Sequence, residues 1–183
     1  MKKLQRASVF LIFSLIVSCN GTMRKATTND TSIEILYYKG IVNTGVSIRC
    51  GEITKPKTSF RKVDTVLTNK QQNTDIANLV KTLKVIDDSI KYCDVRMQCK
   101  INYANGDTVQ LCIGGYSRNC LVKDGRRMEN NDSLVYLLRK YSGYYNYFSK
   151  EELTCFNELK RFGIPKDYKD LSRRNPDGSL KPE

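Results

Sequence analysis

The chain has 183 residues, of which 31 are Lys or Arg and 19 are Asp or Glu, so its formal net charge at pH 7 is +12. It contains seven cysteines and no histidine. Because histidine is absent, Cys–His and Ser–His–Asp catalytic arrangements are excluded, and the commonest metal ligand is missing. The length suits one domain with a single core, flanked by segments that lie outside it.

The first 18 residues have the features of a secretion signal. Residues 2–6 hold three basic side chains, and residues 7–17 are apolar except for two serines. Such a segment suits the h-region of a signal peptide and is too short to cross about 30 Å of hydrocarbon as a helix. It ends in Ile16-Val17-Ser18-Cys19, which resembles the lipobox of bacterial lipoproteins. We therefore expect cleavage before Cys19 and a membrane anchor of acyl chains such as palmitate on that residue. An ordinary secretory signal that ends close to a cysteine is the alternative.

The rest of the chain divides into three parts. Residues 20–32 are polar and, with the lipidated Cys19, are predicted to form a flexible tether over 19–32. Residues 163–183 hold three of the four prolines and are predicted to form a loose basic tail. A single domain is therefore expected over residues 33–162. Removal of residues 1–18 takes away three basic residues and no acidic one, which leaves a net charge of +9.

The domain begins with segments that have the pattern of strands, near residues 33–38, 46–53 and 60–67. A helix is expected from Thr74, a good N-cap, because apolar residues then recur at three- and four-residue steps: Ile76, Leu79, Val80, Leu83 and Ile86.

Two further helices are predicted in the second half of the chain. One is capped by Asn131 or Asp132 and carries four side chains on one face: Leu134, Leu137, Leu138 and Tyr141. The other begins with the capping box Ser149-Lys150-Glu151-Glu152 and is expected to run to Gly163. The order of elements predicts an α+β fold, in which an antiparallel sheet of hairpin and meander packs against two to three helices.

Residues 97–113 predict a hairpin that turns at Asn105-Gly106. A two-residue loop would place the apolar odd-numbered positions of the two arms on opposite faces of the sheet. A three-residue loop over 104–106, with Gly106 in the left-handed region, places them on one face and sets Cys99 opposite Leu111. We expect the three-residue loop, because it buries both apolar sets.

Six cysteines follow Cys19, and an even number outside the cytoplasm favours disulfides. If residues 115–117 form a three-residue loop, Leu111 lies opposite Leu121, and Cys112 lies opposite Cys120 on the other face. Opposed Cα atoms are then roughly 4.5–5.5 Å apart, a spacing that a disulfide tolerates. We therefore expect a Cys112–Cys120 disulfide. The pairing of the others is left open (Cys50, Cys93, Cys99 and Cys155), and reduced cysteines that pack as small apolar side chains are the alternative.

Motifs of catalysis are scarce. Ser59-Phe60-Arg61-Lys62 matches the S-x-x-K motif of penicillin-recognising enzymes, but the companion SDN and KTG motifs are missing. The sequence has no phosphate-binding glycine loop, EF-hand pattern or CxxC. We therefore expect no enzymatic activity, no metal site and no cofactor; a hydrolase that uses carboxylates alone is a weaker alternative.

A cluster of tyrosines is the clearest candidate for a binding surface. It consists of Tyr141, Tyr144, Tyr145 and Tyr147. Tyrosine offers contact area and a polar group at small entropic cost, so the cluster can form a recognition surface. It can equally close the core at a helix end.

Three stretches, YCDVRMQCKINYANGDTVQLC, VKDG and LVYLLRKYSGYYNYF, resemble a group of small lipoproteins of Bacteroidota that have no assigned role. The resemblance spans roughly residues 33–150 and implies a bacterial envelope address and a compact α+β domain, without a catalytic residue. Surface-exported lipoproteins of that phylum often carry an acidic cluster soon after the Cys, and residues 20–24 have none. The resemblance therefore implies an outer-membrane anchor with the domain facing the periplasm.

The same resemblance implies O-glycosylation at Asp-(Ser/Thr)-(small or aliphatic) sites. Four sites fit this pattern, at Thr65, Ser89, Thr108 and Ser133. The alternative is that these Asp–Ser/Thr pairs serve only turns and helix caps.

Together these features predict a lipid-anchored, non-catalytic envelope protein that binds another protein or an envelope polymer. The positive charge favours an anionic partner, but no basic run after the signal exceeds two residues, so nucleic acid is not expected. A periplasmic inhibitor or immunity protein that blocks an enzyme or toxin is the alternative.

Overall fold

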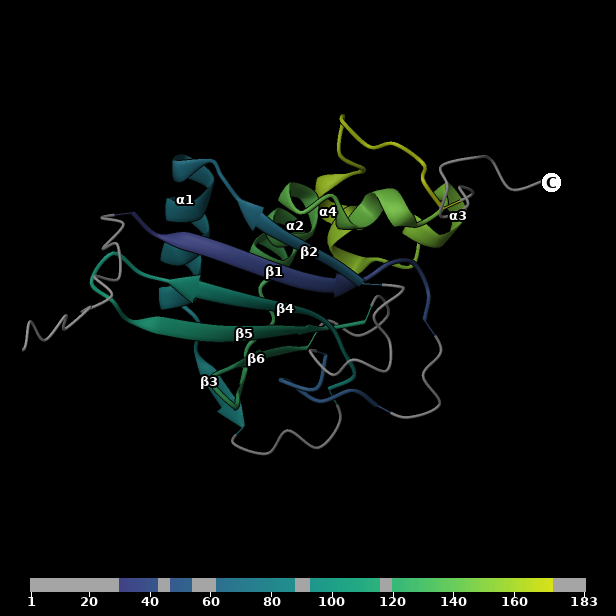
Figure 1. The fold of residues 1–183 in the computed structure, drawn as a ribbon. Helices are drawn as coiled ribbons and strands as arrows, with labels where there is room; N and C mark the ends of the chain where they lie inside the picture. The colour runs from purple at the N-terminus through teal and green to yellow at the C-terminus, as the bar shows by residue number, and fades with distance from the viewer. Residues whose placement is uncertain (1–29, 43–46, 54–61, 88–92, 116–119, 173–183) are drawn as a thin grey trace, which may run out of the picture.

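The structure, a computed structural model, describes residues 30–42, 47–53, 62–87, 93–115 and 120–172. Within these ranges the chain forms a seven-stranded antiparallel sheet in the order β2-β1-β4-β5-β6-β7-β3 (Figure 1). The strands are β1 (Ser32–Tyr38), β2 (Lys62–Leu67), β3 (Val85–Asp87), β4 (Val95–Asn102), β5 (Thr108–Gly114), β6 (Leu121–Lys123) and β7 (Arg126–Met128).

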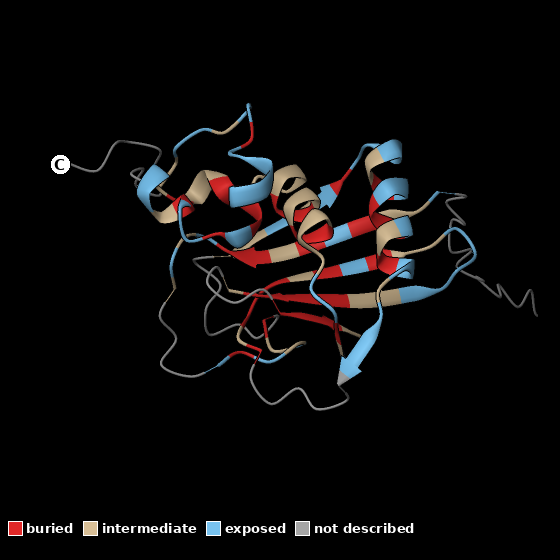
Figure 2. Cartoon of the chain, turned by 180° about the vertical axis from the view of Figure 1, so that it is seen from behind, coloured by how far each residue is buried: buried red, intermediate tan, exposed pale blue. Residues whose placement is uncertain are grey.

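The helices lie on one face of this sheet, as Figure 2 shows from the helical side. They are α1 (Lys70–Lys81), α2 (Asp132–Tyr141), the 3₁₀ helix η2 (Tyr144–Tyr147), α3 (Lys150–Leu153) and α4 (Asn157–Phe162). The main core lies between the two layers and joins residues of β1, β4 and β5 to Ile76 and Val80 of α1 and to Leu134 and Leu138 of α2. The α+β fold predicted from the sequence is confirmed.

The β4–β5 hairpin has the predicted register. Cys99 pairs with Leu111, and Asn102 pairs with Thr108. Gly106 has a φ of +91°, as the three-residue loop requires. Cys99 is fully buried in the core, so the burial argument selects the correct turn length.

Helix α1 begins four residues before the predicted N-cap. The side chain of Asn69 accepts hydrogen bonds from the backbone N–H groups of Gln71 and Gln72 and is the true N-cap. The hydroxyl of Thr74 instead donates to the carbonyl oxygen of Lys70 at 2.9 Å. Ile86 does not belong to the helix, because α1 ends at Lys81 and Ile86 is 53% exposed on β3.

The strand predicted over residues 46–53 is wrong for its described part, residues 47–53, which contain no strand. Ile48 donates its N–H to a carboxylate oxygen of Asp94 at 3.0 Å and accepts from the N–H of Val95 at 2.8 Å. Beyond that point the chain turns at Gly51, whose φ is +86°, so pairing with β4 is not continued.

The C-terminal helix is interrupted. The capping box is present, since Ser149 and Glu152 bond each other's backbone N–H groups, but α3 ends after Leu153. Phe156 adopts extended φ and ψ and is fully buried, and the chain re-enters a helix as α4.

The chain after residue 162 also packs on the domain. The hydroxyl of Tyr168 donates to the carbonyl oxygen of Phe148 at 2.7 Å, and the N–H of Leu171 donates to the carbonyl oxygen of Asn146 at 2.7 Å. The folded domain therefore extends beyond the predicted boundary at residue 162.

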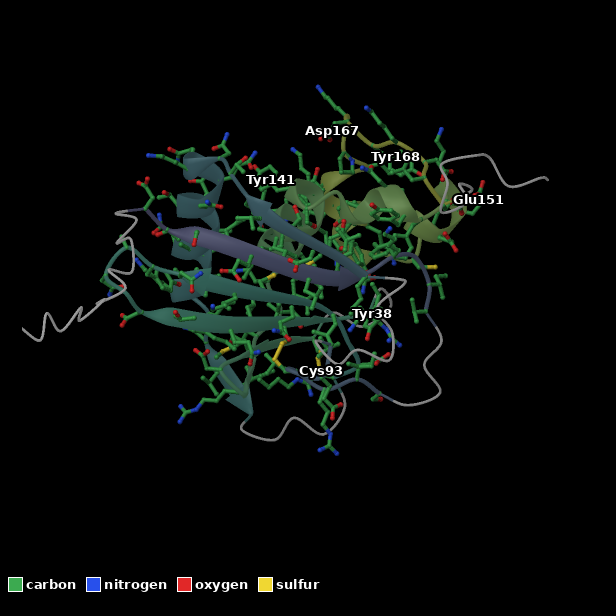
Figure 3. The ribbon with its side chains drawn as sticks, in the orientation of Figure 1. Tyr38, Cys93, Tyr141, Glu151, Asp167 and Tyr168 are labelled. Carbon is green, nitrogen blue, oxygen red and sulfur yellow. A yellow bond between two sulfur atoms is a disulfide. The ribbon has the colours of Figure 1, made fainter. Side chains whose placement is uncertain are left out.

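Two disulfides lie on the face of the sheet away from the helices (Figure 3). They join Cys50 to Cys112 and Cys93 to Cys120, so the predicted Cys112–Cys120 pairing is wrong. The cause is a longer connection between β5 and β6: the N–H of Gly114 bonds the carbonyl of Cys120, and Cys112 pairs with Val122. Cys99, buried, and Cys155, exposed, remain free thiols.

Candidate functional site

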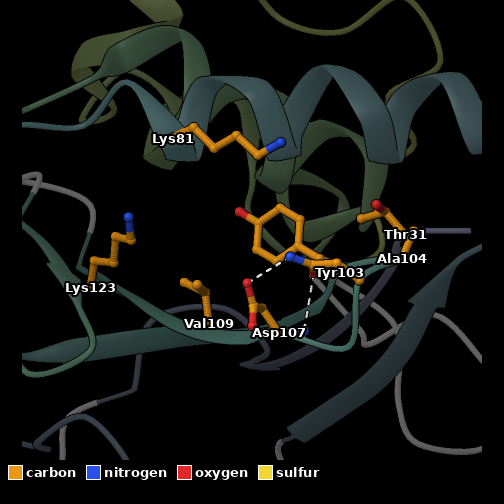
Figure 4. Close-up of a pocket in the computed structure, with 8 residues that line it drawn as sticks. Thr31, Lys81, Tyr103, Ala104, Asp107, Val109 and Lys123 are labelled. Atoms are coloured by element: carbon orange, nitrogen blue, oxygen red, sulfur yellow. Dashed lines mark hydrogen bonds between the residues drawn. The ribbon is translucent and has the colours of Figure 1, made fainter.

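An open groove lies on the helical side of the sheet, between the C-terminal end of α1 and the turn of the β4–β5 hairpin (Figure 4). Its volume is about 430 Å³. The lining residues are Thr31, Lys81, Tyr103, Ala104, Asn105, Asp107, Val109 and Lys123. A volume of this size accommodates a small ligand or a short segment of a larger partner.

The turn of the hairpin forms one wall and is fixed by its own hydrogen bonds. The N–H of Tyr103 donates to the carbonyl oxygen of Asp107 at 2.8 Å, and the N–H of Gly106 donates to the carbonyl oxygen of Tyr103 at 2.9 Å. The amide of Asn105 donates to the carboxylate of Asp107 at 2.7 Å and accepts from the Asp107 N–H at 3.1 Å. The Asp107 carboxylate is therefore engaged within the turn.

Tyr103 forms the floor of the groove. It belongs to the apolar, helix-facing positions of the hairpin but lies where α1 ends, so its ring is only half-buried. Burial raises the pKa of Tyr103, and the carboxylate of Asp124 raises it further. The phenol is therefore neutral at physiological pH and can both donate and accept a hydrogen bond.

Two lysines face the groove from different elements. Lys81 lies in the last turn of α1, where a cation is favoured by the helix dipole, and its Nζ is 5.3 Å from the centre of the Tyr103 ring. Lys123 ends β6 and lies across the groove from Lys81 (Figure 4). An aromatic ring with two ammonium groups in the same groove is complementary to an anionic ligand that also has an apolar or ring-shaped part.

The residues that line the groove supply groups that can bind a ligand. No group of three or more Cys, Asp or Glu side chains within the described ranges is placed to hold a metal ion. Asp107 is the one carboxylate among the residues that line this groove, and no serine or cysteine lines it. The arrangement therefore supplies a stacking surface, a phenol, an amide and two cations.

The predicted tyrosine surface is not formed as a unit. Tyr144 and Tyr145 are each 1% exposed, and the Tyr145 hydroxyl donates to the buried carboxylate of Glu158 at 2.9 Å. Tyr141 and Tyr147 are half-buried. Two of the four candidates thus close the core, because the left-handed Gly143 turns the chain back onto the sheet after α2.

The other predicted sites are dispersed. Thr108 is exposed on β5 and donates its hydroxyl hydrogen to Asn102 at 3.1 Å, whereas Thr65 on β2 and Ser133 in α2 are half-buried. Cys19 and Ser89 lie outside the described residues.

Sequence patterns do not reveal the groove, since Lys81, Tyr103 and Lys123 come from separate elements and no motif joins them.

Comparison with protein-family models, with curated proteins and with solved structures finds no match to this chain. Within the part of the chain that the structure describes, none of the helices has the length and apolar character needed to cross a membrane.

Proposed function

We propose that the protein is a lipid-anchored, non-catalytic component of the bacterial envelope that binds another protein or an envelope polymer. The observation that carries the proposal is the groove, in which Lys81 lies over the ring of Tyr103 and Lys123 adds a second cation to the lining. We assign it to the contact with the partner.

The envelope location is supported by two features of the chain. One is the apolar segment that ends at Cys19. The other is the pair of disulfides, which form and persist in oxidising compartments and are rare in the cytosol.

The groove also indicates the chemistry of the partner. Lysine ammonium groups attract carboxylate, phosphate or sulfate, and a tyrosine face stacks on sugar rings or on planar side chains. An acidic segment of a protein and an acidic glycan both meet these requirements.

Photocrosslinking in cells tests the proposal. Ala104 is exposed at the edge of the groove and is replaced by a photoreactive amino acid; Val66, 52% exposed on β2, receives the same residue as a control. We expect one dominant crosslinked partner from position 104 and none of it from position 66. Equal capture from both positions would contradict the groove as the contact site.

Charge-neutralising variants add a matched control. Lys81→Gln combined with Lys123→Gln removes the two groove cations and should abolish the crosslink from position 104. Lys100→Gln removes a cation from the opposite face of the same hairpin, because Lys100 alternates with the core residues Cys99 and Ile101, and should leave the crosslink intact. If the captured partner is an enzyme or toxin that this protein inactivates, the inhibitor or immunity role replaces the proposed one.

A further inference from the structure

A second surface lies on the outer side of α2 and α4, toward the end of the sheet away from the β4–β5 turn (Figures 1 and 2). Phe162 and Ile164 are 36% and 44% exposed there, on either side of Gly163. Phe162 ends α4 and Ile164 follows it by two positions, so two large apolar side chains remain at the surface close together in the chain.

Basic side chains are packed against aromatic rings around these two residues. The Phe162 ring stacks on the ring of Tyr136, with centres 4.9 Å apart. The Arg161 guanidinium lies 5.1 Å from the centre of Phe162, and Lys140 Nζ lies 5.8 Å from Tyr136 and 5.5 Å from Tyr141. We name this set the basic–aromatic surface: Tyr136, Lys140, Tyr141, Arg161, Phe162 and Ile164.

The named surface itself carries Lys140 and Arg161 and no acidic residue. Two exposed lysines adjoin it in the chain: Lys160 precedes Arg161, and Lys166 follows Ile164 by two positions. With Lys140 and Arg161 they make four cations. Asp167 opposes them, and its carboxylate contributes to the raised pKa of Tyr136 after burial. Three further carboxylates, of Asp170, Glu151 and Glu152, lie near Tyr168 and outside the named surface. Glu158, the acidic residue of α4, is fully buried against Arg139 and contributes no surface charge.

We propose that the basic–aromatic surface contacts an anionic phospholipid bilayer, with Phe162 and Ile164 entering the headgroup region and Lys140, Arg161 and Lys166 meeting lipid phosphates. Apolar and aromatic side chains flanked by Lys and Arg are the combination that binds membrane interfaces. Anionic lipid attracts each of the exposed cations in addition.

This inference rests on the proposed lipid anchor, which also explains why a small surface suffices. The tether enters the domain beside the groove, since Thr31 lines it, and therefore has to pass along the sheet to reach a bilayer at the other end. Asp30 follows Cys19 by 11 positions, and a fully extended chain of that length spans at most about 40 Å, which exceeds the roughly 23 Å length of the seven-residue strand β1. The domain is thus held near the bilayer at an effective concentration in the millimolar range, so weak contacts are occupied. In this orientation the groove lies toward the other end of the sheet and remains open to a partner.

The chain contains no tryptophan, so Phe162→Trp introduces a single tryptophan on the surface, whose emission can be excited selectively in the presence of the tyrosines. The full-length, lipid-modified protein is reconstituted into vesicles of phosphatidylcholine, with or without phosphatidylglycerol. We expect the emission of the Phe162→Trp variant to shift to the blue and to be quenched by brominated acyl chains in the anionic vesicles. High salt, or Arg161→Gln with Lys166→Gln, should reverse both changes.

Ile86→Trp is the matched control, because Ile86 is 53% exposed on β3 and lies outside the basic–aromatic surface. The emission of the Ile86→Trp variant should be the same in vesicles with and without phosphatidylglycerol. If the Phe162→Trp protein floats with the vesicles while its emission stays unshifted, this inference alone is overturned. Protein that does not float overturns the anchor and, with it, this inference.

Discussion

Arg139 of α2 and Glu158 of α4 form an ion pair in which neither side chain is exposed to solvent. Arg139 Nη1 lies 2.5 Å from Glu158 Oε1, and Nη2 donates to the carbonyl oxygens of Gly114 and Gly115 at 2.9 and 3.3 Å. Burial acts to lower the pKa of Arg139, but the Glu158 carboxylate outweighs it, so the pKa is raised and the guanidinium stays charged. The Arg139 guanidinium thus connects α2 to α4 and to the end of β5.

Removal of either partner should destabilise the fold strongly. Arg139→Met leaves a buried carboxylate without its cation, and Glu158→Gln leaves a buried guanidinium without its anion. Each should lower the free energy of unfolding by about 3–5 kcal/mol, as measured by urea denaturation followed by circular dichroism. The double variant buries no charge and should lose much less than the two single losses together. Additive losses would show that the pair is not coupled.

Tyr168 should anchor the segment after α4 in a pH-dependent way. Tyr168→Phe removes the hydrogen bond to the Phe148 carbonyl and should lower stability by about 1 kcal/mol at neutral pH. Burial and the nearby Asp170 carboxylate raise the pKa of Tyr168 to about 12. The folded state favours the neutral phenol. The contribution of the Tyr168 hydroxyl to the free energy of unfolding is therefore fully present below pH 10 and is lost as the pH rises to about 12.

Denaturation of the wild-type protein and of Tyr168→Phe at a series of pH values measures this effect. Other tyrosines with raised pKa values, such as Tyr37, are common to both proteins and cancel in the difference. The stability gap should therefore close between pH 10 and 12. A gap that is constant over this range would mean that the Tyr168 hydroxyl does not titrate with folding.

The two disulfides should contribute unequally. In the chain-entropy account, closing the separation of 62 residues between Cys50 and Cys112 stabilises by about 4 kcal/mol, and closing the 27 residues between Cys93 and Cys120 by about 3.5 kcal/mol. Cys50→Ser with Cys112→Ser should therefore be the more destabilising pair in urea denaturation. Peptide mapping of the unreduced protein gives the direct check, and a peptide that joins Cys112 to Cys120 would contradict the structure.

The strand registers illustrate how much the sequence determines. A one-residue slip in the β4–β5 hairpin would move Ile101 and Leu111 to different faces, so the apolar pattern, together with the turn at Asn105-Gly106, selects the observed register. The predicted register between β5 and β6 is wrong by two residues, and a two-residue shift keeps every side chain on its face. The pattern of burial cannot detect such a shift, so the position of Cys120 depends on a loop length that nothing in the sequence specifies.

Contacts between distant segments explain the other differences. Cys50 reaches Cys112 from a segment without regular structure, and the periodicity of apolar residues through Leu153, Phe156 and Leu159 gives no sign that the helix breaks. The candidate groove depends on the end of α1 meeting a turn and a short strand. The Ser149 capping box is predicted correctly, because it involves neighbours in the chain.

The two free cysteines should differ sharply in reactivity. Cys155 is exposed, whereas Cys99 is fully buried, and burial raises the pKa of the Cys99 thiol far above its usual range. Iodoacetamide at about pH 8 should therefore modify Cys155 in the native protein and Cys99 only after unfolding, because the thiolate is the reactive form. Mass spectrometry of tryptic peptides measures both. Rapid native modification of Cys99 would mean that the helices do not cover β4 as described.

The anchor has the most direct genetic test. Cys19→Ala removes the thiol that lipidation requires, so the variant should be released in soluble form or retained as uncleaved precursor with residues 1–18. Fractionation of cells, with immunoblotting for size, separates these outcomes from the pattern expected for the wild type, mature protein in the membrane fraction. Ser18→Thr, which keeps the cysteine, serves as a control for the change of sequence at this site. If Cys19→Ala protein still fractionates with the membrane at the mature size, the chain is held there by something other than a lipid on Cys19, and the anchor is wrong.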